Sequence, residues 1–168
     1  MTKLIELTEI VLFDWGNTLM IDFPEAQGKM CDWEVVEEVA GAREVLAALS
    51  KQHKLYVATN AADSTEQDII QAFERVGLSQ YILGYFCKAS LGVSKYDFDF
   101  YPAIISKLGV APQDITMVGD TLDKDIYPAL EADLKAVWLN TEGTALKSGH
   151  PNIVQVQSLS ELLEKYYG

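Results

Sequence analysis

Short apolar runs alternate along the chain with segments in which apolar residues recur every three or four positions. Residues 10–13, 55–58, 81–87, 115–118 and 136–139 form five such runs, and 153–156 is a sixth, more polar one. The first of them, Ile-Val-Leu-Phe at 10–13, contains no polar residue, which is typical of a strand buried on both faces. Strands of this kind belong to a parallel sheet covered by helices, and we expect 153–156 at its edge.

Helical spacing predicts a helix after most of these strands. The expected apolar faces are Ala42, Val45, Leu46 and Leu49; Ile69, Ile70, Phe73 and Val76; Tyr101, Ile104, Ile105 and Leu108; and Ile126, Ala129 and Leu130. Ser64 and Gln67 have the spacing of a capping box that opens the second helix, and Gly77 and Gly109 are placed to end two helices. Ser158 opens a last helix.

This regular alternation of strand and helix predicts an α/β protein with a doubly wound parallel sheet. We expect one three-layer α/β/α domain, Rossmann-like, over residues 1–168, a length that suffices for a single core. Residues 20–32 mix proline, glycine and acids without a period, so they read as an irregular loop or short hairpin above the strand ends. No role is assigned to residues 1–8.

Polar residues with chemical potential stand at the carboxyl ends of the predicted strands. They are Asp14, Thr59 with Asn60, Lys95, and Asp120 with Asp125. Ligands of open α/β sheets bind at those ends, so we expect the side chains to converge. A phosphoryl group requires this set: carboxylates for a divalent cation, hydrogen-bond donors for its oxygens, and a cation beside a nucleophile. Mg²⁺ is the expected ion, because it is held by one or two carboxylates, water and substrate phosphate.

Composition narrows the classes of partner. The formal net charge is −12, with 25 acidic and 13 basic residues, which argues against a nucleic-acid partner and is compatible with cation binding. Cys31 and Cys87 lack C-x-x-C spacing and no signal peptide is evident, so reduced thiols and a cytoplasmic location are expected. Without an apolar run of about 20 residues, no membrane span is expected. His53 and His150 are interpreted as surface residues.

The order Asp14-x-x-x-Thr18, Thr59, Lys95 and Gly119-Asp120-x-x-x-x-Asp125 closely resembles the haloacid dehalogenase-like (HAD) hydrolase superfamily, over residues 9–139. The resemblance implies that Asp14 is a nucleophile that forms an aspartyl-phosphate. It implies that Thr59 holds phosphoryl oxygens and that Lys95 screens the charge of nucleophile and phosphate. The implied phosphate-binding residues are Asn17, Thr18, Thr59, Asn60 and Lys95. The implied Mg²⁺ ligands are Asp14, the backbone carbonyl of Gly16, Asp120 and Asp125.

One position departs from the family pattern. Most phosphatases of the superfamily carry a second aspartate two residues after the nucleophile, as general acid and then base, and here that residue is Gly16. Three explanations remain open. In the first, the leaving group needs little protonation, as in an acyl phosphate or a phosphonate. The sequence at Trp15, followed by a small residue, resembles the phosphonoacetaldehyde hydrolase branch, which fits a phosphonate. Another acid, Asp22 or Glu25, substitutes. Or the fold binds phosphate and Mg²⁺ as a regulatory module without efficient turnover.

The spacing of the motifs leaves no room for a large cap domain. About 35 residues separate the first motif, which ends at Leu19, from the second strand, and a similar number lie between Thr59 and Lys95. We therefore expect an open site that takes a small phosphorylated molecule or is covered by a second copy in a homo-oligomer. A phosphorylation-receiver domain is disfavoured because its acid pair comes first, and a dehalogenase because those members carry a helical cap. The sequence predicts a Mg²⁺-dependent phosphohydrolase.

Overall fold

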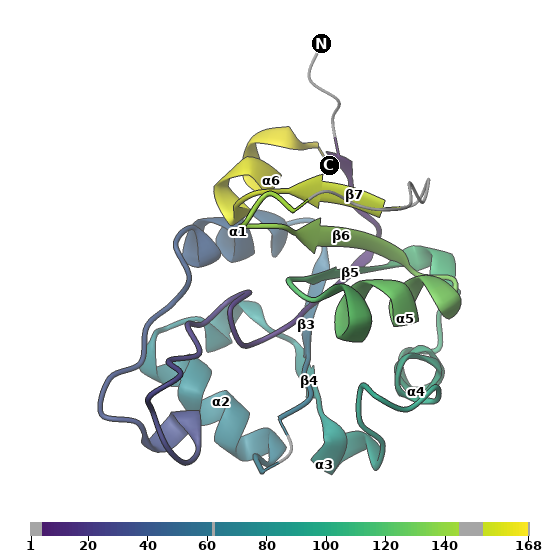
Figure 1. The fold of residues 1–168 in the computed structure, drawn as a ribbon. Coiled ribbons are helices and arrows are strands. Elements are labelled where there is room, and N and C mark those ends of the chain that lie inside the picture. The colour runs from purple at the N-terminus through teal and green to yellow at the C-terminus, as the bar shows by residue number, and fades with distance from the viewer. Residues whose placement is uncertain (1–4, 62, 145–152, 168) are drawn as a thin grey trace.

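The computed structural model describes residues 5–61, 63–144 and 153–167. Its main sheet has six parallel strands in the order β4-β3-β2-β5-β6-β7 (Figure 1). They are β2 (Ile10–Phe13), β3 (Lys54–Ala58), β4 (Gly84–Phe86), β5 (Ile115–Gly119), β6 (Lys135–Leu139) and β7 (Ile153–Val156). The predicted parallel sheet is confirmed, with β7 at its edge.

Helices cover both faces of this sheet (Figure 1). The helices are α1 (Ala42–Leu49), α2 (Glu66–Arg75), α3 (Lys88–Leu91), α4 (Phe100–Leu108), α5 (Tyr127–Glu131) and α6 (Leu159–Lys165). Val11 and Phe13 of β2 pack in one core with α1, α2 and α6, whereas Ile10 and Leu12 pack in a second core with α4 and α5. Successive residues of β2 therefore point to opposite layers, which explains its unbroken apolar run. The three-layer α/β/α architecture is confirmed.

The chain winds outward from β2 in both directions. It passes first to β3 and β4 on one side and then crosses to β5, β6 and β7 on the other. The strand order thus reverses between β2 and β5, the place where open α/β sheets bind ligands. Phe13 pairs with Val118 across this junction, so the two carboxyl ends lie level.

Several boundaries differ from those expected. The α2 capping box uses Thr65 and Asp68, one residue later than predicted, and Ser64 is buried. The strand expected at 81–87 is only Gly84–Phe86, preceded by a 3₁₀ turn at Ser79–Tyr81. Further 3₁₀ turns span Met30–Asp32 and Pro112–Asp114. A π-helical turn, Leu122–Ile126, precedes α5.

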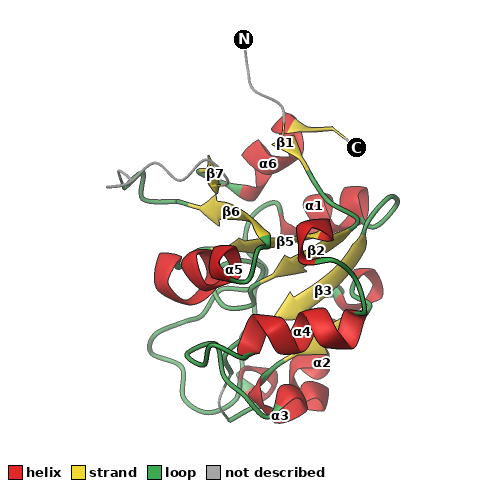
Figure 2. Ribbon diagram, turned by 90° about the vertical axis from the view of Figure 1, so that its right-hand side faces the viewer, coloured by secondary structure: helices red, strands yellow, loops and turns green. Residues whose placement is uncertain are grey.

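A small second sheet gives residues before β2 a role that their pattern did not reveal. Strand β1 (Ile5–Glu6) pairs in parallel with β8 (Tyr166–Tyr167), next to α6 (Figure 2). His53 contacts the Thr8 carbonyl through Nδ1 at 2.5 Å and the Tyr166 hydroxyl through Nε2 at 2.8 Å. The interpretation of His53 as a simple surface residue was wrong, since it is half-buried between these segments. His150 lies outside the described residues.

The stretch between β2 and α1 forms a loop above the strand ends, with isolated bridges of Met20 to Gly16 and Glu38. Within the described part of the chain, neither this stretch nor the segment from β3 to Lys95 forms a separate cap domain. None of the described helices combines the length and the hydropathy needed to cross a membrane.

Candidate active site

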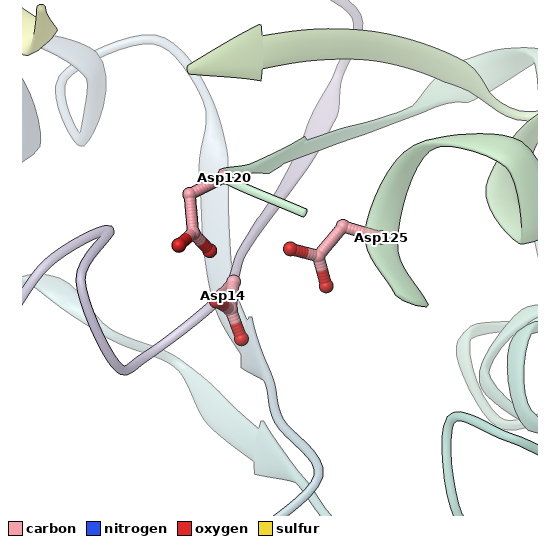
Figure 3. A group of neighbouring side chains, drawn as sticks. All are labelled: Asp14, Asp120 and Asp125. Atoms are coloured by element: carbon pink, nitrogen blue, oxygen red, sulfur yellow. The ribbon is translucent and has the colours of Figure 1, made fainter. Parts of the chain in front are cut away.

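Three carboxylates meet at the junction of β2 and β5 (Figure 3). Asp14 directly follows β2, and its backbone N–H donates to the Val118 carbonyl at 2.9 Å, which continues the sheet by one residue. Asp120 directly follows β5, and Asp125 lies on the π-helical turn. One oxygen from each of the three lies within 4.8 Å of the others. Segments far apart in the chain thus converge as expected from the strand ends.

A glycine makes room for the third carboxylate. The Asp125 side chain is almost fully buried and accepts a hydrogen bond from the Thr121 backbone N–H at 3.2 Å. A Cβ atom at Gly119 would lie 2.6 Å from the Asp125 Cβ and 2.5 Å from its Cγ, closer than real Cβ atoms come. Gly119 therefore allows Asp125 to pack over the end of β5. This lack of space for a side chain explains why glycine precedes Asp120 in the motif.

Lys95 joins two of the carboxylates. Its Nζ donates to Asp14 Oδ1 and to Asp125 Oδ1, each at 2.7 Å, and only 1% of its side chain is exposed. Burial by itself disfavours the ammonium, but the carboxylates of Asp14 and Asp125 outweigh burial and hold the pKa of Lys95 above its ordinary value. Asn60 positions this residue, because its Oδ1 accepts the Lys95 backbone N–H at 3.0 Å. Lys88, the other lysine nearby, is exposed at the start of α3.

The cluster carries more negative than positive charge. Burial, followed by the charge of Asp14 and a hydrogen bond with it, raises the pKa of Asp120 to about 7. Three carboxylates and one ammonium leave an excess of anionic oxygen, which a divalent cation would neutralise. Hard oxygen donors from three segments, two of them partly open to a cavity, fit Mg²⁺ or another hard cation.

A cavity of about 370 Å³ opens above the carboxylates. Of the predicted site residues, it is lined by Asp14, Gly16, Asn17, Thr59, Asn60, Lys95, Asp120 and Asp125. Thr59 follows β3 and is buried, with its N–H bonded to the Phe86 carbonyl. The structure thus brings the predicted residues to one place, with a single exception.

That exception is Thr18. Its side chain is fully buried, and it does not form part of the described cavity wall. The hydroxyl lies 3.3 Å from Asp14 Oδ2 and 3.4 Å from Asp120 Oδ1, below the two carboxylates. The Thr18 hydroxyl thus lies between two carboxylates and away from the cavity wall, and its predicted contact with phosphate stays a prediction.

Loop residues complete the cavity wall, and one of them, Asp22, was named from the sequence as a candidate substitute acid. They include Asp22, Lys29, Met30 and Trp33 above β2, Asp63 and Ser64 after β3, and Lys124 on the π-helical turn. The Nζ of Lys124 stands 5.3 Å from the Tyr96 ring centre. Glu25, the second candidate for a substitute acid, lines a different hollow. Periodicity does not place loop residues, so Asp22 was found only by searching for a substitute acid, and Lys29, Asp63 and Ser64 were not found.

Known proteins resemble this chain in sequence and fold. Human N-acylneuraminate-9-phosphatase is 35% identical over 124 residues, which cover 70% of this chain and 47% of that protein. Pyrimidine 5'-nucleotidase YjjG of Escherichia coli is 28% identical over 130 residues, which cover 77% of this chain and 56% of that one. The chain spans about half the length of the curated relatives it matches.

The magnesium-bound crystal structure of Bacillus subtilis YfnB has a TM-score of 0.74 at 14% identity, covering 94% of this chain and 98% of that chain. This likeness shows a shared fold. A family model described as haloacid dehalogenase-like hydrolase matches residues 20–133, about two thirds of the sequence. The resemblance noted from the motifs is therefore confirmed, and the chain belongs to the haloacid dehalogenase-like hydrolase family.

Proposed function

We propose that this protein is a Mg²⁺-dependent phosphohydrolase that acts through an aspartyl-phosphate on Asp14. The observation that carries the proposal is the placement of Asp14 within 4.8 Å of two further carboxylates and 2.7 Å from a buried ammonium, beneath an open cavity. The relatives named as a phosphatase and a nucleotidase support the same class of reaction.

Asp14 is the nucleophile in this proposal. Its carboxylate forms a bond to phosphorus while the bond from phosphorus to the leaving oxygen breaks, and water then releases inorganic phosphate and restores the carboxylate. The Lys95 ammonium offsets charge on Asp14 and on the incoming phosphoryl group. Thr59 and Asn60, on the cavity wall, are proposed to bind phosphoryl oxygens together with Asn17.

Asp14, Asp120 and Asp125, with the backbone carbonyl of Gly16, are the residues that would hold Mg²⁺. When bound, the ion supplies positive charge to phosphoryl oxygens where negative charge collects. Thr18 and Lys95 orient the carboxylates from below and from the side. Sub-ångström placement of these groups matters, because misplacement of reacting atoms by about 1 Å costs about 10²-fold in rate.

A small phosphorylated molecule is the proposed substrate. A cavity of about 370 Å³ suits such a ligand, and the net charge of −12 opposes binding to a nucleic-acid backbone. Closure of the site by a second copy of the chain, expected from the motif spacing, stays a prediction.

The test is the Asp14→Asn variant, which keeps the size of the side chain and removes the nucleophile. Hydrolysis of a panel of phosphate monoesters with Mg²⁺ should fall by more than about 10³-fold. Asp99→Asn is the matched control, because Asp99 is exposed and makes no side-chain capping bond. Equal activity in Asp14→Asn and wild type would show that the mechanism is incorrect.

A second candidate function rests on Gly16, which lacks a carboxyl group. In this alternative the chain binds Mg²⁺ and phosphate as a regulatory module without turnover. Calorimetric binding of both ligands, combined with no release of phosphate from any monoester in the panel, would favour it over the hydrolase.

A further inference from the structure

The leaving oxygen needs a proton when the bond from phosphorus breaks, and the residues assigned above do not provide one. Asp14 is the proposed nucleophile, Asp120 and Asp125 are proposed ligands of the cation, and the Lys95 ammonium is bonded to two carboxylates. Among the described residues that line the cavity, two further carboxyl groups remain, those of Asp22 and Asp63. Both are exposed to solvent and therefore open to a substrate.

Asp22 lies beside the backbone two residues after the nucleophile. A Cβ atom built on Gly16 would stand 3.4 Å from the Asp22 Cβ and 3.6 Å from Asp22 Oδ2. The carboxyl group of Asp22 therefore occupies the space next to the one that a side chain at residue 16 would enter. It reaches this place from six residues further along the chain.

A tight turn holds Asp22 in place. The Asn17 N–H donates to the Met20 carbonyl at 2.6 Å, and Asn17 Oδ1 accepts the Asp22 N–H at 3.0 Å. Asn17 has a φ of +61°, a left-handed conformation that asparagine tolerates better than most residues. The Ile21 N–H donates to the Glu37 carbonyl at 2.9 Å, near the other end of the same loop. Asp22 is thus anchored by its own backbone, which leaves its carboxyl group free for the cavity.

We propose that Asp22 is the proton donor to the leaving group, an inference that rests on the proposed function. The carboxylate of Asp14 attacks phosphorus, the bond from phosphorus to the leaving oxygen breaks, and that oxygen takes the proton of the Asp22 carboxyl group. The Asp22 carboxylate then accepts a proton from the water that attacks the aspartyl-phosphate. Phosphate leaves, and Asp14 and Asp22 return to their initial states.

The test compares Asp22→Asn with wild type on two aryl phosphates in the presence of Mg²⁺. Phenyl phosphate has a poor leaving group that needs the proton, and 2,4-dinitrophenyl phosphate has a good one that does not. The kcat for phenyl phosphate should fall by about 10²-fold or more, the range for loss of a general acid, with little change for the dinitrophenyl ester. Adding Gly16→Asp to Asp22→Asn should recover part of the loss, since a Cβ at residue 16 meets only ordinary contacts.

Two variants serve as comparisons. Glu25→Gln removes a charge from the same loop but faces another hollow, so it should retain wild-type rates on both esters. Asp63→Asn removes the competing carboxyl group of the cavity and should lower both rates equally or not at all.

The inference would be overturned if Asp22→Asn slowed hydrolysis of both esters equally or left both rates unchanged. It would also be overturned if Asp63→Asn slowed phenyl phosphate but not the dinitrophenyl ester. Failure of the proposed function gives a different pattern: wild type would hydrolyse neither ester, or Asp14→Asn would hydrolyse them as fast as wild type. In that case the proposed role of Asp22 as proton donor would be wrong as well.

Discussion

At the scale of single residues, the site depends on glycines as much as on charged groups. Gly119 leaves the space that Asp125 fills, and Gly16 leaves space beside Asp22. The two positions differ in how full that space is. At residue 119 an added Cβ atom would lie 2.5 Å from the Asp125 Cγ and closer still to Oδ2, whereas at residue 16 the nearest atom is 3.4 Å away.

Gly119→Ala should therefore destabilise the protein and weaken Mg²⁺ binding. Overpacking of this kind costs about 1–3 kcal/mol in free energy of unfolding, because Asp125 or β5 must move. Urea denaturation in buffer without divalent cations measures the cost, and calorimetric titration measures the affinity for Mg²⁺. Gly16→Ala is the control for stability and should change it by less than about 1 kcal/mol. Similar destabilisation by both substitutions would contradict the steric explanation.

At the scale of elements, helix α2 fastens the loop that carries Asp22 and Trp33. Lys29 of the loop donates to Asp68 Oδ2 at 2.9 Å, and Asp68 also completes the α2 capping box with Thr65. Arg75, at the other end of α2, donates to the carbonyls of Cys31 and Trp33. The cavity wall is thus held by both ends of one helix.

Asp68→Asn should loosen this attachment in a pH-dependent way. The hydrogen bond from Lys29, with those from Thr65, lowers the pKa of Asp68 from 3.8 to about 2. A carboxylate whose pKa is lower in the folded state stabilises that state above its unfolded pKa, and loses the effect as pH falls through the folded value. The stability gap between wild type and Asp68→Asn should be full at pH 6 and shrink from about pH 4 towards pH 2.

Urea denaturation at several pH values measures this gap. Asp99→Asn is the control, since Asp99 makes no side-chain capping bond. A gap that stays constant down to pH 2 would show that Asp68 does not act through its charged form.

At the scale of the whole molecule, negative charge is concentrated at the carboxyl ends of β2 and β5, where the strand order reverses. The carboxylates come from the ends of β2 and β5 and from the π-helical turn, in a chain whose net charge is −12. Lys95 offsets only part of this charge, so a cation bound there would join three segments whose carboxylates carry excess negative charge. Folding and cation binding should therefore be coupled.

Mg²⁺ at 100 times its dissociation constant should stabilise the fold by about 2.7 kcal/mol, which raises the Tm by about 5–10 °C for a chain of this size. Thermal denaturation in EDTA and then in MgCl₂ measures the shift. Asp120→Asn should lose the shift and be no less stable than wild type in EDTA, because it removes one of three crowded carboxylates. Asp123→Asn, an exposed neighbour, should keep the full shift. An undiminished shift in Asp120→Asn would exclude this residue as a ligand.

The sequence alone determined the sheet, the order of its motifs and the family. Apolar runs without alternation identify buried parallel strands, and the polar residue after each run marks a strand end that must face the ligand edge. Asp14, Thr59 and Asp120 could be found in this way because each directly follows a strand, whereas Lys95 lies beyond α3 and was identified from the order of the motifs. The fold and the family are confirmed.

Only the tertiary structure decided how these groups are supported. The burial of Thr18 beneath two carboxylates, the bond from Asn60 to Lys95 and the approach of Asp22 to Gly16 depend on where loops pass over the sheet. The pairing of β1 with β8 likewise joins residues about 160 positions apart. Such contacts arise from the packing of distant segments, which leaves no period or spacing in the sequence to reveal them.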